Sequence, residues 1–79
     1  MVARRHGGLR AVLGANVRRL RKAKGLSQEA FGDECSLHRT QVGAVERSEA
    51  NLTMAKLELV AAALAVDASY LLMPHHDAN

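Results

Sequence analysis

Apolar residues recur along most of this chain at the three- and four-residue spacing of an amphipathic helix. One such stripe runs through residues 9–24 and contains Leu9, Val12, Leu13, Val17 and Leu20. Another runs through residues 54–65 and contains Leu57, Val60, Ala61 and Leu64. Because residues three and four apart lie on the same helix face, we expect each stripe to face a shared core. The pattern therefore predicts two longer helices, over residues 9–24 and 54–65.

Capping residues and turns mark the helix boundaries, and the rest of the sequence divides into three shorter helices. Ser27, Thr53 and Asp67 each precede an apolar segment, and their side-chain oxygens are suited to accept a free amide hydrogen from the first turn. Gly25 stands where a residue in the left-handed conformation commonly ends a helix. The further helices are predicted over residues 28–34, 39–47 and 68–72. The expected fold is an all-α domain over residues 9–72, with a flexible basic arm at 1–8 and a disordered tail at 73–79.

The segment LSQEAFGDECSLHRTQVGAVER, residues 26–47, has the pattern of a short helix, a tight turn and a second short helix. Phe31 gives the first helix an inward side, and Val42 and Val45 give one to the second. This arrangement is typical of a helix-turn-helix, whose second helix enters the major groove of DNA. The segment therefore predicts a DNA-binding function.

The outward face of the predicted helix 39–47 carries small and hydrogen-bonding side chains. A helical wheel places Thr40, Gly43, Ala44 and Arg47 opposite the two valines, flanked by Arg39 and Gln41. Arg39 can bind guanine O6 and N7, Thr40 or Gln41 can bond base edges or phosphate, and Ala44 can meet a thymine methyl. Arg47, at the far end, is better placed for a phosphate. Small Gly43 and Ala44 would allow DNA to approach closely; the alternative is a surface helix that carries small residues by chance.

Glu46 lies nearer the inward side of the same helix. An isolated carboxylate there would be costly to bury, so it needs a partner. Arg21, at the edge of the stripe in residues 9–24, is the candidate. We therefore predict a structural ion pair between Arg21 and Glu46.

Composition and charge support a small helical DNA-binding domain. The chain has 79 residues and only two aromatic ones, Phe31 and Tyr70, and its other apolar residues favour helices over a sheet. The net charge is +3, yet no acidic residue precedes Lys24. This basic region suits a polyanion such as DNA, although a solvated basic helix face is the alternative. Arg4 and Arg5 could reach along a phosphate backbone, unless the terminus is simply frayed.

Several of these segments together resemble the Xre/Cro family, the helix-turn-helix domains of lambdoid phage repressors. They are VRRLRKAKGLSQEAF (17–31), the inward Leu37, Val42 and Val45, VER (45–47), and LELVAAALAV (57–66) followed by a short helix. The resemblance covers about residues 13–72 and implies a compact five-helix repressor-like domain. Within the family, HRTQVGAVERSEANLT (38–53) is most similar to the controller proteins of restriction-modification systems. Those are small dimeric regulators.

The resemblance implies roles for particular residues. It implies that Arg39, Thr40 and Gln41 contact bases or the sugar-phosphate backbone, and that Gln28, Arg47 and Asn51 hold phosphates; Ser48 and His38 are further backbone candidates. The chain departs from the controller pattern at four positions. Gln41 stands where controllers usually have an aromatic residue, and Ser36 stands where they often have Gly or Asn. His38, a poor helix cap, replaces the usual Ser or Asp, and Glu49 replaces a basic or neutral residue.

Two-fold symmetry would double the few bases that one such domain can contact. Recognition helices about 34 Å apart would then fit a palindromic operator. The predicted dimer surface is C-terminal and consists of Leu52, Leu59, Val66, Tyr70 and Leu71. For Leu59 the alternative is an ordinary exposed leucine.

Other classes of function find less support. Cys35 and His38 could suggest a nucleophile and base, but Cys35 reads better as a small core residue. His75 and His76 lack a second ligand pair with the spacing of a structural metal site. We therefore expect no metal there, and we expect no enzyme activity or cofactor. A binder of single-stranded RNA would need more exposed aromatic residues. No apolar run is long enough to span a membrane.

The expected function is therefore sequence-specific binding of double-stranded DNA by a dimeric transcriptional regulator of a restriction-modification operon. Its expected location is the bacterial cytoplasm, at the nucleoid, and RNA polymerase is a further candidate partner. The alternative is an antitoxin-type or phage repressor-type Xre regulator whose main partner is another protein.

Overall fold

The chain folds into five α-helices within residues 8–75, the part that the computed structural model describes. They are α1 (Leu9–Ala23), α2 (Gln28–Cys35), α3 (Arg39–Glu46), α4 (Met54–Leu64) and α5 (Ala68–Leu71). The all-α prediction is confirmed. Each predicted C-terminal boundary is off by one residue: α2 ends one residue later, and the others end one residue earlier. None of the helices in this part of the chain combines the length and apolarity needed to cross a lipid bilayer.

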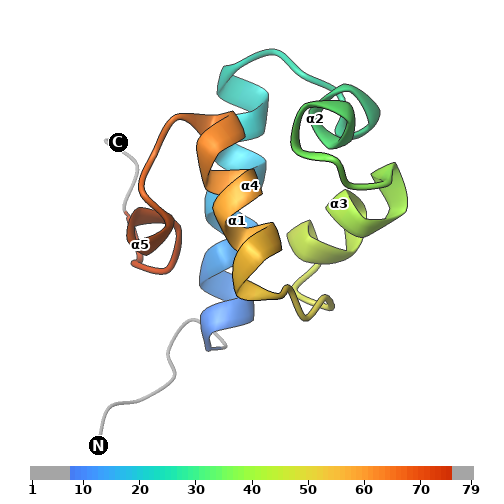
Figure 1. Cartoon of the computed structure of the whole chain (residues 1–79). Coiled ribbons are helices and arrows are strands. Elements are labelled where there is room, and N and C mark those ends of the chain that lie inside the picture. The colour runs from blue at the N-terminus through green and yellow to red at the C-terminus, as the bar shows by residue number, and fades with distance from the viewer. Residues whose placement is uncertain (1–7, 76–79) are drawn as a thin grey trace, which may run out of the picture.

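The helices pack around α1 and α4, which lie at the centre of the molecule (Figure 1). On one side of this pair lie α2 and α3, and on the other lies α5 (Figure 1). The most deeply buried side chains come from all five helices and include Val17, Phe31, Val42, Val60 and Leu71. Fully burying an apolar side chain of this size contributes about 1.5–3 kcal/mol. The core therefore holds the α2–α3 pair against the central helices.

Two of the three predicted N-caps form their side-chain hydrogen bonds. Ser27 Oγ accepts from Ala30 N at 3.0 Å, and Thr53 Oγ1 accepts from Lys56 N at 3.1 Å. Asp67 is the N-cap residue of α5, but its side chain makes no capping hydrogen bond. The four-residue helix α5 instead depends on the buried Leu71.

The two ends of the described chain differ from the prediction. Gly8, assigned to the basic arm, is the N-cap residue of α1, and Leu9 is 63% exposed although it belongs to the predicted apolar stripe. Leu9 lies at the rim of a shallow depression that Met54 and Leu72 also line. The remaining residues of the predicted arm and tail, 1–7 and 76–79, lie outside the described part.

The segment Met73–His75 packs back onto the helices, so the prediction of a disordered tail is wrong for these residues. Buried Asn16 donates from Nδ2 to the carbonyl oxygens of Leu71 and Met73, both at 2.9 Å. The His75 ring stacks on Tyr70 with ring centroids 3.8 Å apart. A buried amide must be hydrogen-bonded, and here that requirement ties the end of α5 to α1.

Gly14 lies where α1 passes closest to α3. A Cβ atom at this position would be 2.5 Å from the Val45 carbonyl oxygen and 3.0 Å from that of Glu46. Both neighbours are backbone atoms, which cannot move away as a flexible side chain can. Glycine is therefore required for the observed spacing between α1 and α3.

Gly14→Ala should lower the free energy of unfolding by about 1–3 kcal/mol, because the added methyl group forces the two helices apart. Urea denaturation measures this change. Gly43→Ala is the matched control. Its Cβ would approach the flexible end of Arg47 at 3.0 Å, and alanine is intrinsically better than glycine in a helix by about 1 kcal/mol. Equal losses in the two variants would contradict the close crossing at Gly14.

Candidate nucleic-acid interface

The turn between α2 and α3 is fixed by backbone geometry. Ser36 adopts the left-handed conformation with φ of +62°, and Leu37 N donates to the Gly32 carbonyl oxygen at 2.9 Å. A Cβ atom on Gly32 would overlap the Leu37 carbonyl oxygen. The buried Leu37 side chain then anchors the turn to the core. The tight turn predicted from the sequence is present, although Cys35 belongs to α2.

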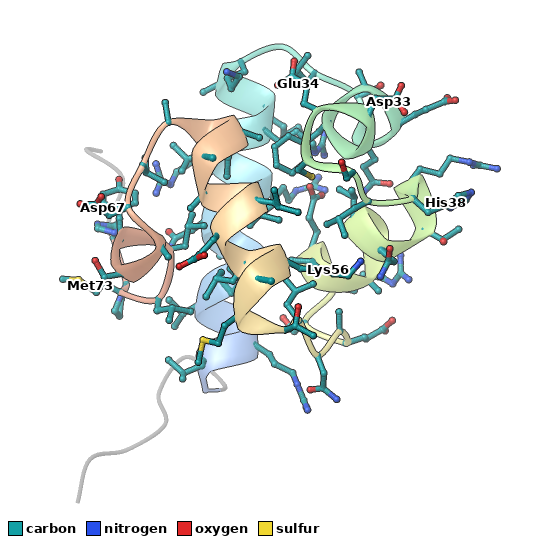
Figure 2. The ribbon with its side chains drawn as sticks, viewed as in Figure 1. Asp33, Glu34, His38, Lys56, Asp67 and Met73 are labelled. Atoms are coloured by element: carbon teal, nitrogen blue, oxygen red, sulfur yellow. The ribbon has the colours of Figure 1, made fainter. Side chains whose placement is uncertain are left out.

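The first turn of α3 projects from the protein surface. Val42 and Val45 are 1% and 3% exposed and attach the helix to the core. Arg39, Thr40 and Gln41 are all exposed. Figure 2 shows His38, at the start of α3, pointing into solvent on the side of the molecule away from α5. The candidate base-reading residues therefore lie at an accessible helix end, and the helix itself is fixed to the core by buried valines.

Gly43 does not belong to the exposed face, so this part of the prediction is wrong. It is buried in the folded protein. A Cβ atom there would lie 3.0 Å from Arg47 Nη1 and 3.5 Å from Gln28 Oε1. The side chains of Gln28 and Arg47 thus cover this part of α3, and Ala44 is only partly exposed. A helical wheel of α3 alone contains no information on a side chain that arrives from α2.

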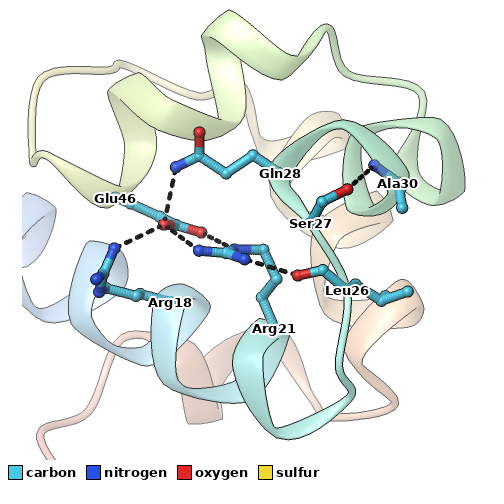
Figure 3. Close-up of polar contacts among 7 residues, drawn as sticks. All are labelled: Arg18, Arg21, Leu26, Ser27, Gln28, Ala30 and Glu46. Atoms are coloured by element: carbon cyan, nitrogen blue, oxygen red, sulfur yellow. Dashed lines mark hydrogen bonds and ion pairs between the residues drawn. The ribbon is translucent and has the colours of Figure 1, made fainter.

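A buried ion pair joins α1 to α3, between the residues predicted from the sequence (Figure 3). Arg21 donates from Nε to Glu46 Oε2 at 2.6 Å and from Nη2 to Oε1 at 3.1 Å. The two side chains are 9% and 2% exposed. Gly25, with φ of +73°, turns the chain after α1. As a result the Leu26 carbonyl oxygen accepts from Arg21 Nη1 at 2.6 Å.

Two further side chains surround the Glu46 carboxylate (Figure 3). Gln28 donates from Nε2 to Oε1 at 3.1 Å, and Arg18 Nη1 lies 3.6 Å from the same oxygen. The sequence prediction omits Arg18. Arg18 precedes Arg21 by three residues, a spacing that places both side chains on one helix face. This spacing is the sequence feature that could have predicted a contact between Arg18 and Glu46. Glu46 therefore connects α3 to both α1 and α2.

These contacts determine the ionisation of the pair. Burial of Glu46 raises its pKa, but the hydrogen bonds from Arg21 and Gln28 and the nearby positive charges outweigh it, so the pKa is lowered. The hydrogen bond to Glu46 raises the pKa of Arg21. Both groups are therefore charged at neutral pH.

Acid should destabilise the fold through Glu46. A carboxyl group whose pKa is lower in the folded than in the unfolded state stabilises the fold above its ordinary pKa of 4.5. This contribution is lost as the pH falls through the lowered pKa. We expect the urea midpoint to decrease below about pH 4.5 and to decrease less steeply in Glu46→Gln. Parallel profiles for the two proteins would contradict this role of Glu46.

His38 caps α3, contrary to its description as a poor cap. Its Nδ1 accepts from Thr40 N at 3.1 Å and lies 2.9 Å from Thr40 Oγ1. In return, Gln41 Oε1 accepts from His38 N at 3.4 Å, which completes a capping box. The imidazole nitrogen thus serves as the acceptor that a Ser or Asp oxygen usually supplies.

The candidate phosphate-binding residues lie around α3 but differ in their own contacts. Gln28 is the first residue of α2 and binds Glu46. Arg47 pairs with Glu49 at 3.1 Å, and both side chains are more than half exposed, so the pair holds weakly. Ser48 follows α3 with φ of +66°. Asn51 Oδ1 accepts from Arg10 Nε at 2.9 Å, a contact for which the sequence offered no local signal.

The basic residues of α1 are partly engaged within the protein. Arg18 and Arg21 face Glu46, and Arg19 donates from Nη2 to Asn16 Oδ1 at 3.0 Å. Lys22 and Lys24 are exposed. The expectation that this region as a whole serves a polyanion is therefore too broad. Arg4 and Arg5 lie outside the described residues.

The predicted dimer residues do not form one exposed surface. Leu59 is 47% exposed, whereas Leu71 is completely buried in the core of its own chain, so its assignment to a dimer surface is wrong. The short helix α5 directs Leu71 inward, as its burial shows. Leu52, Val66 and Tyr70 are partly buried against the core. Leu59 is the most accessible of the five.

Comparison with known proteins agrees with this geometry. Residues 17–71 match the helix-turn-helix family. A hypothetical transcription factor of Neisseria meningitidis serogroup B is 50% identical over 66 residues, which are 84% of this chain and 62% of that protein. This chain thus spans less than two thirds of that relative. A crystal structure of a hypothetical transcription factor from Neisseria is also 50% identical, with a TM-score of 0.80. The match covers 84% of this chain and 74% of the chain in that structure.

Restriction-modification proteins are also among the relatives. The control protein C.SmaI of Serratia marcescens is 43% identical over 71% of this chain and 67% of its own length. The controller protein C.AhdI from Aeromonas hydrophila is 38% identical, with a TM-score of 0.72 over 76% of this chain and 91% of its own. The chain therefore belongs to the helix-turn-helix family, as its Xre/Cro-like sequence pattern indicates.

Proposed function

We propose that this protein is a sequence-specific regulator of transcription that binds double-stranded DNA as a homodimer and controls a restriction-modification operon. The observation that carries the proposal is the exposed first turn of α3, with Arg39, Thr40 and Gln41. Its helix is fixed by buried valines and by the Arg21–Glu46 pair. A rigid helix end with hydrogen-bonding side chains is what major-groove recognition requires. The relatedness to controller proteins supports the choice of operon.

The proposed contacts fall into two groups. Arg39, Thr40, Gln41 and Ala44 read bases, with Arg39 donating to guanine O6 and N7. The contacts to the sugar-phosphate backbone come from Gln28, His38, Arg47, Ser48 and Asn51. Because His38 Nδ1 accepts from Thr40 N, the hydrogen of the neutral ring lies on Nε2. That N–H group can donate to a phosphate oxygen.

We further propose that a homodimer places two α3 helices about 34 Å apart on a palindromic operator. Leu59 is the central residue of the proposed dimer surface because it is apolar and half exposed on α4. Leu59→Lys should give a monomer in sedimentation at tens of micromolar. Met54→Lys, a matched change on the same helix, should leave the dimer intact. A wild-type protein that sediments as a monomer would exclude this proposal.

The proposed site of action is the bacterial cytoplasm, at the nucleoid. No enzymatic step is part of the proposal. A regulator bound beside a promoter also meets RNA polymerase, which is therefore a proposed partner.

A gel-shift titration with the protein's own upstream DNA tests this function. Competitor duplex of unrelated sequence and competitor RNA are added at fixed salt, and the titration is repeated at several salt concentrations. We expect a shifted complex that survives both competitors and weakens steeply with salt, because phosphate contacts release counterions. Equal competition by unrelated DNA or by RNA would contradict the proposal.

A further inference from the structure

The capping box of α3 fixes which atoms of Gln41 are free. Gln41 is exposed, and its amide oxygen lies 3.4 Å from His38 N. A backbone N–H group can only donate, so the side-chain atom that faces it must be the acceptor Oε1. The amide Nε2, with its two hydrogens, is then the part of the side chain that is not bound to the helix start.

Reading of an adenine by glutamine uses both amide atoms. The oxygen accepts from adenine N6 while the nitrogen donates to N7, and the two atoms must face the same base edge. With Oε1 turned back toward His38 N, Gln41 meets this condition only if the capping bond breaks. A contact from Nε2 to guanine O6 or N7, or to thymine O4, leaves the capping bond intact. Adenine N7 can also accept from Nε2, but the amino group on adenine N6 beside it faces Nε2 with a second donor, whereas guanine offers two acceptors there.

We propose that the capping box makes Gln41 a donor-only reader, which selects a guanine or thymine edge and discriminates against adenine. This inference rests on the proposed function, since it concerns how the same helix reads DNA. His38 acts here as a positioning residue through its backbone N–H group. Specificity at one base pair of each half-site is thus set by a bond within the free protein.

Selection from a duplex library randomised across the half-site tests the proposal. Comparison of the wild type with Gln41→Ala identifies the base pair that depends on Gln41. We expect guanine or thymine to be enriched over adenine there by at least about fivefold, and this preference to be lost in the variant. Enrichment of adenine, or an unchanged consensus in Gln41→Ala, would overturn the inference.

A matched pair of variants isolates the capping bond. His38→Ala and His38→Pro both remove the imidazole, but only proline removes the N–H group that holds Oε1. The φ of His38 is −68°, which a proline ring adopts. The preference against adenine should persist in His38→Ala and fall to within about twofold in His38→Pro. Equal preferences in the two variants would show that the capping bond is not the cause.

Gln41→Glu keeps the proposal testable if His38→Pro fails to fold by circular dichroism. Its carboxylate still accepts from His38 N but offers only acceptors to the groove. The preferred base should therefore change to adenine or cytosine, which carry amino groups. An unchanged base would overturn the inference. A wild-type protein that enriches no sequence at all would instead contradict the proposed function itself.

Discussion

Arg21→Ala should lower the free energy of unfolding by about 3–5 kcal/mol, the cost of leaving one partner of a buried ion pair alone. The variant would leave the Glu46 carboxylate, 2% exposed, without its two shortest charged hydrogen bonds. It would also leave the Leu26 carbonyl oxygen without its donor. Small domains are stable by only about 5–15 kcal/mol, so this loss removes a large part of the total stability. Thermal and urea denaturation measure the change.

Arg18→Ala is the control for this experiment. Arg18 contacts the same carboxylate oxygen, but at 3.6 Å and with a side chain that is 55% exposed. An exposed ion pair contributes at most about 1 kcal/mol. Arg21→Lys should rescue little, because one ammonium group cannot form the two-pronged contact that a guanidinium makes. A melting temperature unchanged in Arg21→Ala would show that the pair does not hold α3 in place.

Arg39→Ala should abolish sequence discrimination at one base pair of each half-site without affecting the fold. Arg39 is exposed and lies in the first turn of α3. A bidentate contact to guanine contributes about 1–3 kcal/mol of discrimination, and a dimer makes the contact twice. Affinity for the operator should therefore fall by about 2–6 kcal/mol, while affinity for unrelated DNA changes little. Fluorescence anisotropy with operator and scrambled duplexes measures both.

Arg47→Ala provides the contrast to this result. If Arg47 binds a phosphate, its loss should weaken binding to all sequences and reduce the slope of log K against log salt by about 1 for each half-site. Within residues 8–75 the Arg47 guanidinium forms an ion pair only with Glu49, and because that pair is exposed, the side chain can move to a phosphate. If Arg39→Ala kept its discrimination between operator and unrelated DNA and Arg47→Ala lost it, Arg47 would be the base-reading residue and Arg39 would not.

The parts of the fold that depend on local sequence could be predicted. Ser27 and Thr53 form the expected caps because a cap involves only the next three residues. The Arg21–Glu46 pair could also be predicted, although its members are 25 residues apart. A carboxylate on the inward side of a helix requires a cation, and Arg21 was the one at the edge of an apolar stripe. Burial thus made this long-range contact predictable.

Other contacts could not be predicted because their partners are set only by the packing of the helices. Asn16 binds backbone carbonyls 55 and 57 residues away, and any carbonyl can serve as such an acceptor. Gly43 is covered by a side chain from α2, which depends on the angle between the two helices. Leu71 is buried because α5 directs it inward. The capping by His38 depends on one ring orientation that sequence preferences do not specify.

The central claim is that the first turn of α3 reads DNA from the major groove. Methylation interference on the operator tests it most directly, because dimethyl sulfate modifies guanine N7 in the major groove and adenine N3 in the minor groove. We predict that guanine methylation blocks binding at two clusters about 10 base pairs apart, while adenine methylation between them has no effect. Binding that is insensitive to guanine N7 methylation, or blocked only by adenine N3 methylation, would contradict the claim.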